Sequence, residues 1–293
     1  MGPPMGTVAF ALVITSAFAH AGWNFLLKRS EHKTSFLWSA GGVAVVAMLV
    51  PAVVFAFFDE PGWGGVAFGV GSGVIHGVYG MSLSRGYQLG ELSSVYPVSR
   101  GMGPALVPIA AVVLFDEHIS ALAGVGIGLI VVGIYAIHID HRLWRDVTHP
   151  IRALTGPATR IAFLTGALIA SYSLWDKAAL DYLSPITLNG FSMAGHFLVL
   201  TPLVLMSGTD GVRTEWRLRR RSIVAAGILV PLAYTLVLAA LTTSQVSYIA
   251  PVREVGIVIG VVLGVVFLGE GYGVTRVLGS ALIVSGVIGL AVG

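Results

Sequence analysis

Ten apolar stretches follow one another along the chain, separated by short polar or charged segments. Each is about as long as the roughly 20 residues that an α-helix needs to cross the hydrocarbon core of a bilayer. We therefore predict an all-α integral membrane protein with ten transmembrane helices and no soluble domain. The predicted helices lie near residues 7–27, 34–58, 64–86, 92–114, 120–139, 161–180, 186–206, 222–241, 246–268 and 272–292, with longer connections only near 140–160 and 207–221.

The second five helices repeat the pattern of the first five at an offset of about 153 residues. Arg100 in the fourth helix aligns with Glu254 in the ninth, and Gly133 in the fifth aligns with Gly286 in the tenth. Because each half holds an odd number of helices, the halves must have opposite orientations in the membrane. Inverted repeats of this kind are typical of secondary transporters that work by alternating access.

This repeat divides the chain into a first repeat over 1–139, a basic linker over 140–160 and a second repeat over 161–293, which together form one structural unit. Composition agrees with the membrane class, because 56% of the residues are apolar, 11% are charged and the mean hydropathy is +0.88. The apolar first stretch has no positive charge before it and has a counterpart in the sixth, so we expect a retained helix rather than a signal peptide.

Several kinds of chemistry are not supported by the sequence. The chain has no cysteine, which excludes disulfides and thiolate metal sites. Metalloprotease, serine-hydrolase and phosphate-binding-loop motifs are missing as well. We therefore predict no enzyme activity, no cofactor, no metal and no ATP-driven pumping, and any transport would draw on a gradient. Nucleic acid is not an expected partner.

Basic residues predict the orientation of the helices. The loops after the odd-numbered helices carry all of the 17 Lys and Arg residues except Lys177, on the opposite side, and Arg100 and Arg253, within helices. Cytoplasmic loops carry the excess of Lys and Arg. Both termini should therefore lie outside the cytoplasm.

Three charged residues within predicted helices are the sharpest functional signal. Arg100, Arg253 and Glu254 each lie seven or eight residues into a helix, roughly 11 Å deep at 1.5 Å per residue. A charge at the centre of a membrane helix costs roughly 2.5–3.5 kcal/mol even on the gentler scale, so all three should face the protein interior. They either form a buried ion pair that locks the two halves, or bind the carboxylate and ammonium of a substrate, with Glu254 alternatively serving as a proton-coupling group.

Polar and aromatic residues recur on one face of the first and sixth helices. His20, Trp23 and Asn24 are three and four residues apart, and Tyr172, Trp175 and Asp176 repeat this face, although Asp176 is not counted among the candidate site residues. They are interpreted as substrate-binding residues, or alternatively as interhelical hydrogen-bonding groups and interfacial anchors. An aromatic lining over several helices is predicted from His76, Tyr79, Tyr96, Tyr234 and Tyr248. The alternatives are that the histidine is a packing residue, which is the commoner role, and that the tyrosine hydroxyls only bond backbone exposed at kinks.

Proline and glycine mark two other features. Pro97 and Pro251 should interrupt the helices that hold the charges and act as hinges, unless these helices are merely kinked. Small faces for close helix packing are predicted where glycine recurs every four residues, at Gly69, Gly73 and Gly77, at Gly124 and Gly128, and at Gly256, Gly260 and Gly264.

The ten spans, the run from His20 to Asn24 followed by Lys28, and Glu117 and Glu270 after the fourth and ninth spans together resemble the EamA branch of the drug/metabolite transporter superfamily. The resemblance implies a central cavity between the halves, lined by helices one, three and four and by their partners six, eight and nine. Within the branch, the chain is similar to bacterial metabolite exporters, and its aromatic residues and paired charges are what an aromatic amino-acid exporter of the YddG type would need.

These observations predict a secondary-active exporter of small metabolites, chiefly aromatic and other neutral amino acids, in the bacterial inner membrane. Its partners would be the substrate and the lipid bilayer, with proton coupling as an option, and it would be a monomer or weak dimer. The alternatives are a transporter of drugs or other metabolites with the same fold, and a membrane sensor or assembly protein that transports nothing.

Overall fold

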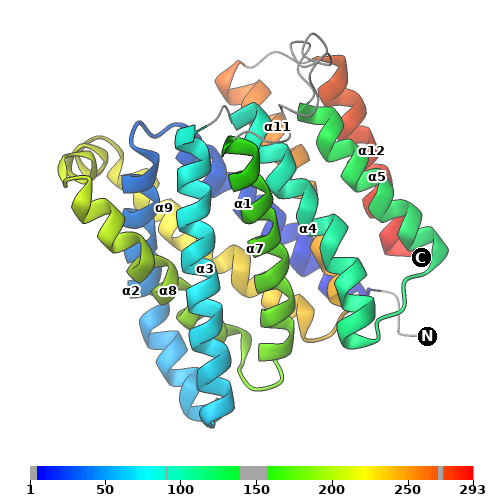
Figure 1. Cartoon of the computed structure of the whole chain (residues 1–293), viewed down its shortest axis with the longest axis horizontal. Coiled ribbons are helices and arrows are strands. Elements are labelled where there is room, and N and C mark those ends of the chain that lie inside the picture. The colour runs from blue at the N-terminus through cyan, green and yellow to red at the C-terminus, as the bar shows by residue number, and fades with distance from the viewer. Residues whose placement is uncertain (1–4, 90–91, 139–156, 270–272, 293) are drawn as a thin grey trace. The chain divides into compact units, whose positions relative to one another are not determined.

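The computed structural model describes residues 5–89, 92–138, 157–269 and 273–292, without the side chains of 87–89, 92–98, 138, 158, 159 and 268. Within these ranges every regular element is an α-helix (Figure 1). The helices are α1 (Thr7–Lys28), α2 (Lys33–Asp59), α3 (Trp63–Leu89), α4 (Leu92–Phe115), α5 (Ala121–His138), α7 (Pro157–Ala179), α8 (Pro185–Met206), α9 (Asp210–Leu241), α10 (Val246–Val252), α11 (Val255–Leu268) and α12 (Val274–Val292).

Each predicted stretch is helical in the structure, and most ends agree within about a turn. The ninth stretch is divided into α10 and α11. Among the described residues, seven helical segments are long and apolar enough to cross a membrane, and shorter apolar helices cover Ser99–Phe115 and Ala121–Ile137. That ten helices cross the bilayer stays a prediction. The predicted linker lies outside the described residues over 140–156.

The predicted connection over 207–221 is wrong, because α9 begins at Asp210 and includes the arginine-rich segment with a kink at Arg219. Hydropathy reports which residues lie in lipid and does not detect a polar helix. Glu215 lies in this arginine-rich segment of α9. Its carboxylate accepts hydrogen bonds from the backbone N–H groups of Glu31 and His32, each at 2.8 Å, and so caps the N-terminus of α2 and holds the segment in place.

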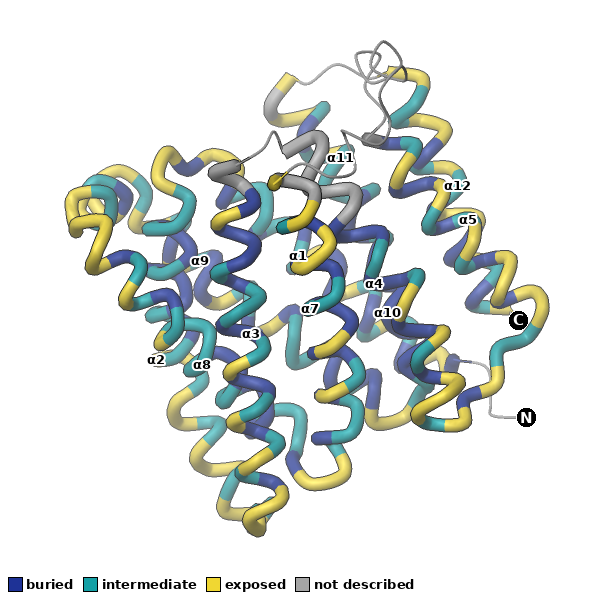
Figure 2. Tube along the Cα trace, in the orientation of Figure 1, coloured by how far each residue is buried: buried dark blue, intermediate teal, exposed yellow. Residues whose placement is uncertain are grey.

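The distribution of exposed side chains is typical of a surface that faces lipid. On α2, large apolar residues are strongly exposed, with Val46 at 73%, Phe57 at 77% and Phe58 at 80%, and Figure 2 shows exposed residues interspersed with buried ones along the helices. A soluble helix would place polar residues there. These apolar faces therefore agree with the membrane class predicted from composition.

The chain forms two compact units, and each contains helices from both predicted repeats. Unit 1 comprises Met1–Gly6, Ser82–Ser173 and Ser244–Gly293, and unit 2 comprises Thr7–Met81 and Leu174–Thr243. Unit 1 therefore contains α4, α5 and α10 to α12, and unit 2 contains α1, α2, α8 and α9, while α3 and α7 each run from one unit into the other. The repeat boundaries remain a prediction from the sequence.

In unit 1, α5 and α12 pack through reciprocal glycine contacts. A Cβ on Gly126 would lie 2.7 Å from the Gly286 carbonyl oxygen, and one on Gly133 would lie 2.6 Å from that of Gly279. The offset that aligns Gly133 with Gly286 also aligns Gly126 with Gly279. Each glycine therefore contacts the counterpart of the other, which is the contact pattern that a twofold relation requires. This reciprocity supports the inverted repeat.

The predicted small faces are partly right. Gly69, Gly73 and Gly77 do face α8, because a Cβ on Gly73 would lie 2.8 Å from the Phe191 carbonyl oxygen and Cβ atoms on the other two would overlap the side chains of Phe191 and Val199. Gly124, Gly128 and Gly260, by contrast, lie in open space, because an added Cβ would have no neighbouring atom within 4 Å. The face of α5 that packs closely is the one bearing Gly126 and Gly133.

We expect Gly195→Ala to destabilise the protein. A Cβ on Gly195 of α8 would overlap the Gly73 carbonyl group of α3, and overpacking of this kind typically costs about 1–3 kcal/mol. Gly124→Ala is the matched control, because it adds the same methyl group to a helix where no atom lies within 4 Å and Ala is the better helix former. Thermal unfolding in detergent should show a lower midpoint for Gly195→Ala alone; equal midpoints would contradict the close approach of α3 and α8.

Candidate functional site

Three predicted charges meet in unit 1. Arg100 comes from α4, whereas Arg253 and Glu254 lie at the junction of α10 and α11. The Arg100 guanidinium is 3.0 Å from the Glu254 carboxylate, and the Arg253 guanidinium is 3.9 Å from the same carboxylate. All three side chains are buried, at 5%, 6% and 1% exposure for Arg100, Arg253 and Glu254. The prediction that they face the interior is confirmed.

The helix break that presents two of these charges follows from Pro251. Proline has no N–H and its ring crowds the preceding turn. The backbone at this point tightens, since the Glu254 N–H donates to the Pro251 carbonyl at 3.0 Å and the Ile257 N–H donates to the Glu254 carbonyl at 2.9 Å. Helix breaks at membrane depth are tolerated where the backbone is buried in protein or lines a cavity.

The equivalent break in the fourth helix is not observed. α4 is one continuous helix from Leu92 to Phe115, so the expected interruption at Pro97 is absent from the secondary structure. The side chains of Pro97 and Tyr96 lie outside the described ones. Their roles as hinge and lining residue therefore stay predictions.

Tyr172 of α7 belongs to the same cluster in unit 1. Arg253 donates to the Tyr172 hydroxyl at 3.3 Å, and its guanidinium carbon lies 5.8 Å from the centroid of the tyrosine ring. This arrangement combines a hydrogen bond with a cation–π contact. Two guanidinium groups and one carboxylate leave these residues with an excess of positive charge, which suits an anionic group such as a carboxylate.

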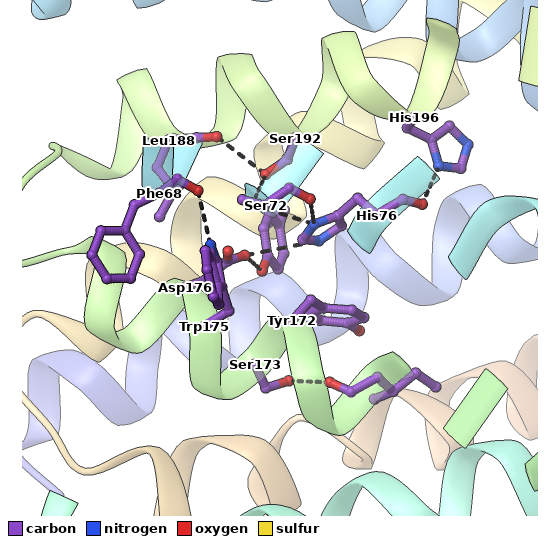
Figure 3. Close-up of polar contacts among 12 residues, drawn as sticks. Phe68, Ser72, His76, Tyr172, Ser173, Trp175, Asp176, Leu188, Ser192 and His196 are labelled. Carbon is purple, nitrogen blue, oxygen red and sulfur yellow. Dashed lines mark hydrogen bonds and ion pairs between the residues drawn. The ribbon is translucent and has the colours of Figure 1, made fainter. Parts of the chain in front are cut away.

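Unit 2 holds a second buried polar cluster, around Asp176 of α7 (Figure 3). The Tyr234 hydroxyl of α9 donates to the Asp176 carboxylate, and His76 Nε2 of α3 lies 3.9 Å from it. The His76 ring packs edge-on to Tyr234, with centroids 5.0 Å apart. Ser72 and Ser192 join α3 to α8 beside His76 through a 2.8 Å hydrogen bond.

Asp176 was placed on the repeated polar face by the sequence but was not counted among the candidate site residues. The offset of 152 that aligns Trp23 with Trp175 also aligns Asn24 with Asp176 on the repeated polar face. In the structure Asp176 is fully buried, at 0% exposure. A buried membrane carboxylate is a functional hypothesis by default, whereas alignment with a neutral amide made this one less conspicuous.

The face of α1 makes mainly local contacts. Trp23 Nε1 donates to His20 Nδ1 at 3.2 Å, and the Asn24 amide donates to the His20 carbonyl at 2.8 Å. Trp23 is also part of an apolar cluster with Leu27, Phe36, Leu37, Ala40, Ile223 and Ala226. For Trp23 these contacts favour the packing interpretation.

The other predicted residues lie in different surroundings. Trp175 is 38% exposed and donates to the Phe68 carbonyl of α3 at 2.9 Å, which is a helix-to-helix contact. Tyr248 is buried, and its hydroxyl accepts from the Ser120 N–H at 3.5 Å, at the start of α5. Tyr79 is partly buried on α3.

The structure therefore groups the predicted residues within units. In unit 1 it brings together Arg100, Arg253, Glu254 and Tyr172, and in unit 2 His76 and Tyr234 surround Asp176. Among the described residues, no three His, Asp or Glu side chains are arranged to hold a metal ion.

Comparison with known proteins gives a family match for the second half of the chain. Residues 159–292 match the model of the EamA-like transporter family, which covers nearly all of the predicted second repeat. One solved crystal structure is 18% identical to this chain in sequence and superposes on it with a TM-score of 0.69. The alignment covers 97% of this chain and 95% of the chain in that structure. At this identity the likeness shows the fold alone. The comparison with curated proteins found no match.

The family match and the helices lead to the same class. Residues 159–292 match the EamA-like transporter family model, and seven described helical segments are long and apolar enough to cross a bilayer. Together they indicate a multi-pass membrane protein, and the family that the second half matches is one of transporters.

Proposed function

We propose that this chain, whose residues 159–292 match the EamA-like transporter family, is a secondary-active exporter of aromatic and other neutral amino acids that works by alternating access. Arg100 and Arg253 receive the substrate carboxylate, and Glu254 receives its ammonium group. The chain lies in the bacterial inner membrane with both termini outside. It works as a monomer or weak dimer.

The observation that carries the proposal is the buried trio of Arg100, Arg253 and Glu254. The two arginines share one carboxylate at 3.0 and 3.9 Å, and such guanidinium groups can also bind the carboxylate of a substrate. An amino acid brings such a carboxylate together with an ammonium group that Glu254 can bind. A zwitterion therefore satisfies both signs, whereas an uncharged ligand satisfies neither.

Tyr172 supports an aromatic or apolar substrate side chain. Its ring is buried at 5% exposure and its hydroxyl is held by Arg253, so a rigid aromatic surface adjoins the charges. Binding sites for small molecules combine such apolar walls with a few charged groups that fix orientation. The sequence adds further proposed substrate-binding residues, namely His20, Asn24, His76, Tyr79, Tyr96, Trp175, Tyr234 and Tyr248.

Alternating access is supported by the reciprocal contacts of α5 and α12. Gly126 contacts Gly286 and Gly133 contacts Gly279, as expected if the two repeats are related by a twofold axis. Inverted repeats exchange conformations to expose a site to either side of the membrane. The break after Pro251, between α10 and α11, provides a hinge beside the proposed substrate.

The competing interpretation is that the same ion pair only locks helices in a sensor or assembly protein. The 3.0 Å distance from Arg100 to Glu254 agrees with both interpretations. They differ in flux, because a lock contributes to stability alone. A transport measurement therefore separates them.

The test loads proteoliposomes containing the purified chain with labelled phenylalanine, or with threonine as the smaller neutral substrate. We expect efflux well above the leakage of empty vesicles, and a higher melting temperature for the protein when phenylalanine is added, since a ligand of the native state stabilises it. If protein shown to be folded exports neither amino acid above leakage, the proposed substrate class is wrong.

A further inference from the structure

Unit 2 contains a buried carboxylate that the proposed substrate site does not use. Asp176 has 0% exposure. Its Oδ2 accepts the Tyr234 hydroxyl and faces His76 Nε2 at 3.9 Å, as Figure 3 shows for Asp176 and His76. Its Oδ1 is buried and has no hydrogen-bond partner among the described residues. An unsatisfied carboxylate oxygen at such a position indicates a ligand that the protein alone does not provide.

The hydrogen bonds of His76 define where a proton would go. His76 Nδ1 lies 3.0 Å from the Ser72 carbonyl oxygen, which only accepts, so Nδ1 carries the hydrogen. In the neutral ring Nε2 is then an acceptor, and it faces the carboxylate of Asp176. Two acceptors that face each other gain a favourable contact when the carboxylate takes up one proton and donates it to Nε2.

The other titratable and charged groups nearby do not replace that proton. From α9 comes Tyr234, which already donates to Asp176. From α8 comes His196, whose Nδ1 lies 3.3 Å from the His76 carbonyl oxygen. On α7 itself, Lys177 donates to the Leu241 carbonyl at 2.7 Å. Within the described residues, the ion-pair partner of Asp176 is His76.

Glu254 is a poorer site for the same proton. Its carboxylate lies within 4 Å of both Arg100 and Arg253, at 3.0 and 3.9 Å. The negative charge of Glu254 therefore already has two cationic partners within the protein. Protonation at Asp176 and His76 instead removes an isolated buried negative charge.

We propose that Asp176 and His76 form a proton-binding site that couples export to a proton gradient. This inference rests on the proposed function. One proton from the outer solution binds between Asp176 and His76, neutralises their single negative charge, and leaves unchanged to the cytoplasm when the conformation reverses, while one substrate molecule moves outward. No bond other than those to the transferred proton forms or breaks.

Infrared difference spectroscopy tests the binding of the proton without any substrate. Acidification of the purified wild-type protein should produce the carbonyl stretch of a protonated buried carboxyl group, and Asp176→Asn should abolish this band. Glu254→Gln is the control and should retain it. Tyr234→Phe, which removes the donor to Oδ2, should move the band to higher wavenumber and provides the test if Asp176→Asn does not fold. A band that persists in Asp176→Asn, or is unmoved in Tyr234→Phe, overturns the site.

Transport measures the coupling. One pH unit is worth about tenfold in concentration for one coupled proton. Wild-type proteoliposomes should therefore concentrate labelled phenylalanine toward about that limit under a gradient of this size. In Asp176→Asn the ratio of gradient-driven phenylalanine accumulation to phenylalanine exchange should fall toward the value found without a gradient. Asp176→Glu should restore part of this ratio.

The outcomes separate this inference from the proposed function. Exchange by the wild-type protein without gradient-driven accumulation, or an unchanged ratio in Asp176→Asn, overturns the coupling while the exporter stands. Absence of any exchange removes the exporter and the coupling with it, and the infrared band then decides the proton site alone.

Discussion

Glu254→Gln is expected to reduce phenylalanine efflux by about 30-fold or more. In the proposed exporter Glu254 binds the substrate ammonium, and truncating one partner of a buried charge pair costs about 2–5 kcal/mol, where each 1.4 kcal/mol is about tenfold. Initial efflux rates from proteoliposomes with equal amounts of folded protein give the measurement. The change is the smallest that removes the charge while it keeps the shape of the side chain.

The melting temperature of the same variant distinguishes binding from a structural lock. If Glu254 serves the substrate, efflux falls by a much larger factor than stability accounts for. Glu31→Gln is a suitable control, because the Glu31 side chain is exposed and the substitution is chemically identical. Parallel losses of efflux and stability in Glu254→Gln would instead favour the lock between Arg100 and Glu254.

Glu117→Ala is expected to destabilise the protein by several kcal/mol. The buried Glu117 carboxylate accepts hydrogen bonds from the N–H groups of Val246 and Ser247, each at 2.9 Å, and so caps the N-terminus of α10. Hydrogen bonds to charged groups contribute about 1.5–3 kcal/mol each, and a carboxylate at a helix N-terminus gains further from the helix dipole. Denaturation in mixed micelles measures the difference.

Glu31→Ala again serves as the control for Glu117→Ala, because it removes an exposed carboxylate. Its midpoint should stay close to that of the wild-type protein. A midpoint for Glu117→Ala that equals the control would mean that the cap contributes nothing to the position of α10, and the ordering of the segment before Pro251 would need another explanation.

The helices were predictable because each membrane span is a continuous apolar stretch of the sequence. About 20 apolar residues are needed for each span, so the observed ends of α1, α2 and α8 agree with hydropathy within two residues of the prediction. The start of α9 was not predictable in this way. Its first turns carry Glu215 and the arginines up to Arg221, and a helix stabilised by contacts outside the apolar region has no hydropathy signal.

The charged cluster was predictable from depth and alignment together. Arg100 and Glu254 are expensive in lipid and occupy equivalent repeat positions, and the structure brings them to 3.0 Å. The cluster around Asp176 was harder to predict. Its partners His76 and Tyr234 come from α3 and α9, and only the packing of these helices shows that the three side chains meet.

Glycine spacing gave a mixed result for a related reason. A four-residue period places glycines on one helix face, but it does not say which face meets a neighbour. Gly73 faces α8, whereas for Gly124 no atom lies within 4 Å of an added Cβ. The close contact of α5 uses Gly126 and Gly133, which are seven residues apart and were recognised only from the structure.

The most direct test of the substrate site compares the equilibrium binding of phenylalanine and 3-phenylpropionate, which lacks the amino group, to the wild-type protein and to Glu254→Gln. If Glu254 binds the ammonium, loss of the amino group should weaken binding to the wild-type protein by about tenfold or more and should have little further effect in Glu254→Gln, because the two changes remove one interaction. An equal loss of affinity in both proteins would show that Glu254 and the substrate ammonium do not interact, and would contradict the account.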